Sequence, residues 1–146
     1  MNGRERPQTL EPVHADEAQS EPRKWAFWLM VYLRAMAAIS LIKGLYHWAV
    51  ICGINAPYPS GFEAYSVPYQ VATVFFAVID PVAGVGLWLA APWGAVLWLT
   101  SVISMATVEV LFPQIFGGSL VVVVTEIVLL AVYLSLTVLA AREQPE

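Results

Sequence analysis

Residues 77–99 read AVIDPVAGVGLWLAAPWGAVLWL and hold a single charged side chain, Asp80. The apolar run is interrupted at residues 90–94 (AAPWG), where proline and glycine favour a tight turn, and it then resumes. Apolar segments of about 20 residues on both sides of a short turn are typical of helices that cross a lipid bilayer. This stretch therefore predicts two antiparallel transmembrane helices.

The same pattern continues outward on both sides of this predicted hairpin. The apolar segments cover residues 25–51, 67–91, 93–112 and 119–141, and the loops between them contain proline and glycine. The longest loop, residues 52–66, reads CGINAPYPSGFEAYS. We therefore expect an all-α fold, a polytopic membrane protein with a four-transmembrane-helix bundle spanning residues 25–141.

The composition agrees with this class. Hydrophobic residues make up 59% of the 146 residues and charged residues 12%, against about 45–50% and about 25% in soluble domains. Most of the charged residues lie in the two ends, residues 1–24 and 142–146, which we expect to be a disordered arm and a short tail. A soluble globular domain, a disulfide scaffold and a nucleic-acid-binding protein are excluded, and the lipid bilayer is the first expected partner.

The basic residues predict the orientation in the membrane. Five of them flank the outer ends of the apolar region, whereas the loops 52–66 and 113–118 contain no lysine or arginine. Because cytoplasmic segments carry an excess of basic residues, both termini are expected in the cytoplasm. The five are Arg4, Arg6, Arg23, Lys24 and Arg142.

Charged side chains inside the apolar region need a partner, a proton or water, because a charge at the bilayer centre costs about 2.5–3.5 kcal/mol or more. At about 1.5 Å per residue, Arg34 lies about 14 Å inward from Trp25, and Asp80 lies about 16 Å inward from Ala91. The two residues lie on consecutive antiparallel helices at nearly equal depth. We therefore predict an intramembrane ion pair between Arg34 and Asp80.

A second group of ionisable residues lies nearer the outer side. The depths of these residues below the outer edge of the membrane, estimated in the same way, are similar. They predict an outer polar cluster of Lys43, His47, Glu109 and Glu126. Arg34 and Lys43 fall on opposite faces of one helix, so we expect Lys43 to extend outward, unless the helix bends or its second face meets another subunit. The interior charges either fix helix packing, form a pathway for a proton, ion or headgroup, or face a partner protein.

No arrangement of side chains predicts catalysis or a metal site. The chain has one cysteine, and its two histidines, His14 and His47, are expected on opposite sides of the membrane. Asp80 precedes Pro81, which removes a helical hydrogen bond, and Gly84 and Gly86 predict close approach of a neighbouring helix. No cofactor is expected, except that a quinone headgroup belongs to one alternative below.

The first two segments resemble the DoxX-like family of small four-helix bacterial inner-membrane proteins. The resemblance rests on Leu33-Arg34, on Lys43-Gly44-Leu45 and on residues 80–87 (DPVAGVGL). Residues 77–99 and 112–118 (FPQIFGG) are similar to a bacterial membrane family of unknown function. The second resemblance implies a fold and a location in the bacterial cytoplasmic membrane, and no activity. The DoxX-like resemblance implies a link to quinone-coupled oxidation and to oxidative-stress complexes.

Two functions are compatible with these observations. Four helices with short loops leave no soluble domain for chemistry, so we expect a non-enzymatic accessory or scaffold subunit of an inner-membrane complex, with a membrane-protein partner or a second copy of the chain. The alternative is a redox or transport component, in which the intramembrane charges bind a proton, an ion or a quinone headgroup.

Overall fold

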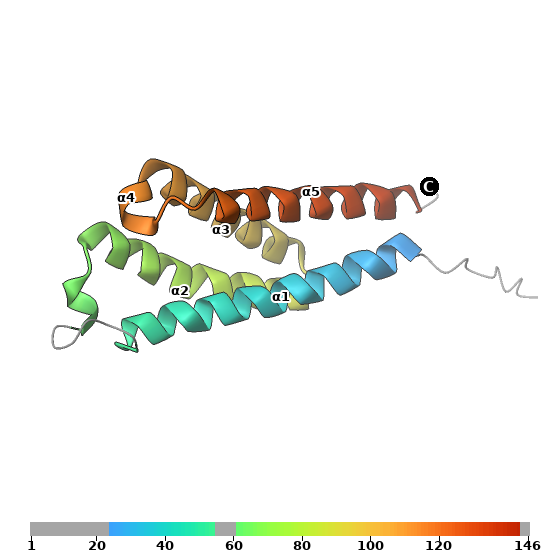
Figure 1. Ribbon diagram of the computed structural model, residues 1–146. Coiled ribbons are helices and arrows are strands. Elements are labelled where there is room, and N and C mark those ends of the chain that lie inside the picture. Colours follow the sequence, from blue (N-terminus) through green and yellow to red (C-terminus); the bar gives the residue numbers. More distant parts are fainter. Residues whose placement is uncertain (1–23, 55–60, 144–146) are drawn as a thin grey trace, which may run out of the picture.

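The computed structural model describes residues 24–54 and 61–143 (Figure 1). The long helices are α1 (Lys24–Ile51), α2 (Val67–Trp88), α3 (Pro92–Leu111) and α5 (Leu120–Arg142). Two short helical segments lie in the loops, a 3-10 turn at Gly61–Ala64 and α4 at Pro113–Phe116. All four long helices are long and apolar enough to cross a membrane, and these two ranges contain no strand. The predicted all-α bundle of four such helices is confirmed.

The ends of the helices differ from the predicted ones by a few residues. Helix α2 ends at Trp88 because Ala90 adopts φ 52°, in the left-handed region, and the Ala91 amide donates back to the Gly86 carbonyl. Lys24 begins α1 and Arg142 ends α5, so both belong to helices rather than to the predicted ends of the chain. The rest of the predicted arm, 1–23, and the last residues, 144–146, lie outside the described residues.

Two contacts set the position of α1 along α2. Pro81 has no amide hydrogen, so the Ala77 carbonyl four residues earlier loses its helical partner, and the Trp48 indole Nε1 donates to that oxygen at 2.8 Å. One turn along, Gly44 lies against the Pro81 ring, where a Cβ would collide with it. The proline in α2 thus determines which residues of α1 lie beside it.

Helices α2 and α3 approach each other even more closely. Gly86 and Gly94 bring the two backbones into contact, and a Cβ on either glycine would meet backbone atoms of the other helix. Gly84 faces Leu41 and the Ala37 carbonyl of α1. The close approach predicted from Gly84 and Gly86 is therefore confirmed, with a different helix at each glycine.

The apolar core lies between α1, α2 and α3, and α5 packs against the outer side of this core (Figure 1). The Tyr32 hydroxyl of α1 donates to the Leu129 carbonyl of α5 at 2.7 Å, and Trp98 of α3 lies edge-on to Tyr32 and Tyr133. Only Glu126 and Ala140 of α5 are buried, so most of this helix is available to lipid or to a partner. The buried core residues are Met36, Ala37, Ala83, Leu87, Trp98 and Val102.

Candidate functional site

Asp80 is the centre of a buried polar cluster, with 1% of its surface exposed. One carboxylate oxygen, Oδ1, accepts a hydrogen bond from the Ser101 hydroxyl of α3 at 2.5 Å. The other, Oδ2, lies 3.7 Å from the Lys43 ammonium and 4.0 Å from His47 Nε2, both on α1. Asp80 therefore connects three helices through polar contacts inside an apolar bundle.

The contacts between α1 and α2 explain why these partners meet. Lys43 precedes Gly44 and His47 precedes Trp48, and those two neighbours are the residues that pack on Pro81 and the Ala77 carbonyl. The lysine and the histidine are consequently held on the side of α1 that faces Asp80. The expectation that Lys43 extends outward is wrong, because its ammonium lies beside this carboxylate.

The predicted ion pair between Arg34 and Asp80 is not formed. Within residues 24–54 and 61–143, the basic groups within 4.0 Å of Asp80 are the Lys43 ammonium and the His47 imidazole. The Arg34 guanidinium lies over the Trp88 ring instead, 5.1 Å from its centroid. The prediction estimated depth from the helix ends and assumed that the ends of α1 and α2 lie at the same depth. In the structure α1 is shifted along α2, so that Arg34 lies beside Trp88 at the end of α2, about 12 Å along the helix from Asp80.

The four residues of the predicted outer polar cluster are divided among three places. Lys43 pairs with Asp80, and His47 and Glu109 line a cavity of about 210 Å³ between α1, α2, α3 and α4. Glu109 is buried, and its Oε2 accepts a hydrogen bond from the Ser119 amide at 3.1 Å. Glu126 does not line this cavity and lies in a groove between α3 and α5, within electrostatic range of Lys43, Glu109 and Asp80.

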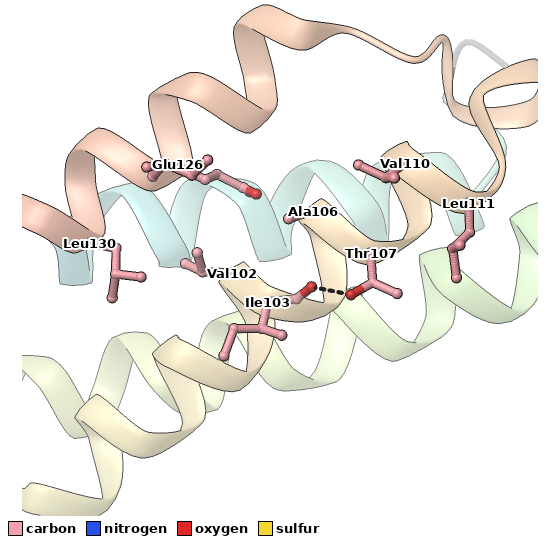
Figure 2. Close-up of a pocket in the computed structure, with 9 residues that line it drawn as sticks. Val102, Ile103, Ala106, Thr107, Val110, Leu111, Glu126 and Leu130 are labelled. Carbon is pink, nitrogen blue, oxygen red and sulfur yellow. Dashed lines mark hydrogen bonds between the residues drawn. The ribbon is translucent and has the colours of Figure 1, made fainter.

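The groove beside Glu126 has a volume of about 410 Å³. Figure 2 shows the Glu126 side chain extending from α5 toward Ala106 of α3, among apolar side chains. Thr107 adds no polar group to the groove, since its hydroxyl donates to the Ile103 carbonyl of its own helix at 2.7 Å (Figure 2). Glu126 Oε2 is buried, and no hydrogen-bond partner reaches it from the described part of the chain.

Ser101 is the site residue that the sequence analysis missed. A signal for it was present, because Asp80 lies ten residues before Ala90 and Ser101 ten residues after Ala91. In a tight helical hairpin, residues equally far from the turn lie at equal depth. The cluster offers carboxylate, ammonium, imidazole and hydroxyl groups, and in the described ranges no group of three or more His, Cys, Asp or Glu side chains is placed to hold a metal ion.

The four long apolar helices around a buried acid and lysine define a small polytopic membrane protein. Residues 27–144 match the model of the Family of unknown function (DUF6163), and the chain belongs to this family. The match agrees with the sequence-level resemblance to an uncharacterised membrane family. No curated protein and no solved structure matches the chain.

Proposed function

We propose that this protein is a non-enzymatic accessory subunit of a membrane assembly. In this proposal a transmembrane helix of the partner lies in the groove between α3 and α5 and directs a cationic or hydrogen-bond-donating side chain to Glu126. The observation that carries the proposal is the buried Glu126 carboxylate, whose Oε2 has no hydrogen-bond partner and no cation within 4.0 Å among the described residues. Asp80 Oδ2 also lacks a hydrogen bond but lies 3.7 Å from the Lys43 ammonium.

An unsatisfied carboxylate at this place is costly to the isolated chain. Burying a polar group without a hydrogen bond costs about 1–3 kcal/mol, and a charge in a membrane helix costs more. Three buried carboxylates, those of Asp80, Glu109 and Glu126, accompany Lys43 in the bundle, and Lys43 is already paired. A hydrogen-bond donor from another chain would provide the partner that the Glu126 carboxylate lacks. Because α5 is mostly unburied, a partner helix has room to reach it.

Replacing Glu126 by leucine is expected to prevent assembly with the partner without lowering the stability of the isolated protein. The isolated protein in detergent should unfold at the same temperature as the native protein or at a higher one, because the substitution removes an unsatisfied buried group. The same change should abolish co-purification of the membrane partner from mild detergent extracts. Thermal unfolding followed by tryptophan fluorescence and native gel electrophoresis of the tagged protein provide the two measurements.

The matched control is Thr107→Val, which changes another residue of the same groove whose hydroxyl bonds only within its own helix. This variant should retain the partner. Loss of stability in Glu126→Leu would show that the carboxylate is satisfied within the chain, and retention of the complex would refute its role in assembly.

The second candidate is a component that binds a proton, an ion or a quinone headgroup. The placement of His47 favours it, because the imidazole lies 4.0 Å from Asp80 Oδ2 and also lines the cavity that contains Glu109. Buried chains of acids and histidines are typical of proton relays in membrane proteins. Proton uptake by the purified protein in liposomes distinguishes this candidate from an accessory subunit, which would show none.

The proposal includes a relationship to the DoxX-like proteins, a bacterial cytoplasmic membrane location and cytoplasmic termini. The basic residues at both ends of the apolar region support this orientation. Cys52, the only cysteine of the chain, tests it, because its side chain is exposed just beyond the end of α1.

A membrane-impermeant maleimide is expected to label Cys52 in cells whose outer membrane has been made permeable. A Cys52→Ser, Glu143→Cys variant carries the thiol at the opposite end of the bundle and should be labelled only after the inner membrane is disrupted. The reverse pattern would place the termini outside the cytoplasm.

A further inference from the structure

The cavity that contains Glu109 has no part in the accessory role and shares one residue, His47, with the Asp80 cluster. It lies where α1 ends and α2 begins, beside α4, and its volume is about 210 Å³. That space equals about seven water molecules at their liquid volume, enough for a small organic group. Its walls are mainly aromatic, with one carboxylate.

The aromatic rings hold one another in place. His47 stacks on Phe76 with centroids 5.5 Å apart, and Tyr69 stacks on Phe116 at 5.7 Å. Tyr46 lies edge-on to His47 at 5.6 Å. All five rings line the cavity and come from α1, α2 and α4. A ligand would therefore meet ring surfaces that are already positioned, which lowers the entropy cost of binding.

Glu109 provides the charge of this cavity. Its side chain is 5% exposed, and no lysine, arginine or histidine of the described residues lies within 4.0 Å of its carboxylate. The Glu109 carboxylate thus has no cation paired with it among the described residues, and the Lys43 ammonium lies nearer the Phe76 wall, 6.0 Å from its ring centroid.

From this combination we infer that the cavity binds a small organic ammonium ion. Several aromatic faces around one carboxylate are the arrangement that recognises methylated ammonium groups, because the ring faces and the carboxylate both attract a cation. A metal ion would prefer several oxygen or nitrogen ligands. A neutral molecule would gain at most a hydrogen bond from the carboxylate, without the added attraction of opposite charges. The cavity shares no lining residue with the groove at Glu126, and the inference does not rest on the assembly proposed there.

Choline and tetramethylammonium serve as probes, and 3,3-dimethylbutan-1-ol, which replaces the quaternary nitrogen of choline by carbon, serves as the neutral control. Isothermal titration of the purified protein in phosphatidylglycerol nanodiscs should show saturable binding of both cations. The neutral control should bind at least about tenfold more weakly. Equal binding of choline and its neutral analogue, or no saturable binding of either cation, would overturn the inference.

Variants locate the binding in this cavity. Glu109→Gln and Phe116→Leu should each weaken choline binding by about tenfold, with an unfolding temperature that shows the protein is folded. Thr107→Val, outside the cavity and without a change of charge, should leave choline binding unchanged. Glu109→Gln should leave the proposed assembly at Glu126 intact, so the two proposals fail separately. Weakening by Thr107→Val equal to that by Glu109→Gln would place the cation elsewhere.

A further arm identifies the source of the ammonium group. If the natural ligand is a lipid headgroup, nanodiscs of phosphatidylcholine should compete with free choline and raise its apparent Kd relative to phosphatidylglycerol nanodiscs. If the ligand is a free ammonium compound, the two lipids should give the same Kd.

Discussion

Replacing Asp80 by alanine is expected to lower the free energy of unfolding by about 1–3 kcal/mol, the usual cost of leaving a buried polar group such as the Ser101 hydroxyl without its partner. The change removes the acceptor of the Ser101 hydroxyl and the counter-charge of Lys43 together. It leaves a polar cavity inside the bundle. Unfolding in detergent, titrated with sodium dodecyl sulfate and followed by tryptophan fluorescence, measures the loss.

Graded substitutions separate the contributions of the two partners. Asp80→Asn retains an oxygen for Ser101 and should cost less than Asp80→Ala, because the Lys43 side chain is 34% exposed and is able to turn toward water or lipid headgroups. Lys43→Gln should also destabilise the protein.

Arg34→Gln is the control for the Asp80 result, since Arg34 lies on the Trp88 ring at the bundle surface. It should cost no more than about 1 kcal/mol, the usual value of an exposed cation–π contact. A larger loss from Arg34→Gln than from Lys43→Gln would show that Asp80 pairs with the arginine after all.

Replacing Gly86 by alanine is the second change with a large expected effect. The new methyl group would occupy the space of the Gly94 Cα and the Trp93 ring. Backbone atoms are unable to rotate away as a side chain does, so α2 and α3 must separate. We expect a loss at or above the upper end of the about 1–3 kcal/mol that overpacking usually costs, measured by the same detergent unfolding experiment.

Two further variants test the cause of this effect. Val85→Leu enlarges the adjacent, half-exposed residue on the outside of the helix and should be nearly neutral. Gly94→Ala should be as harmful as Gly86→Ala, but the double variant should cost less than the sum, because helices already separated by one methyl group accommodate the second. Strict additivity would mean that the two glycines do not face each other.

Much of the architecture follows from local sequence features. A run of about 20 apolar residues predicts a membrane helix wherever it occurs, and residues 90–94 predict a tight turn from proline and glycine alone. Gly84 and Gly86 likewise predict close packing, because the absence of a side chain is a property of the residue itself. The structure confirms these features of the fold.

Pairing between helices follows a different rule, and here the prediction failed for Arg34. The depth of a residue depends on how far one helix is shifted along another, and that shift is determined by the contacts of Gly44 with Pro81 and of Trp48 with the Ala77 carbonyl. A depth estimated by counting residues from the helix ends takes neither of these contacts into account. It therefore placed the arginine beside Asp80, where the structure places Lys43.

The sequence alone thus determined that the chain crosses a membrane as a bundle of four helices, because burial in lipid depends on the composition of each segment separately. It also showed which ionisable groups require an explanation. Only the tertiary structure decided that Asp80 pairs with Lys43 and Ser101, and that Glu126 lies in a groove with one oxygen unsatisfied. Those contacts depend on how far one helix is shifted along another and how it is rotated. The contacts of Pro81 with Gly44 and of the Trp48 indole with the Ala77 carbonyl determine both, and they exist only when the helices are packed together.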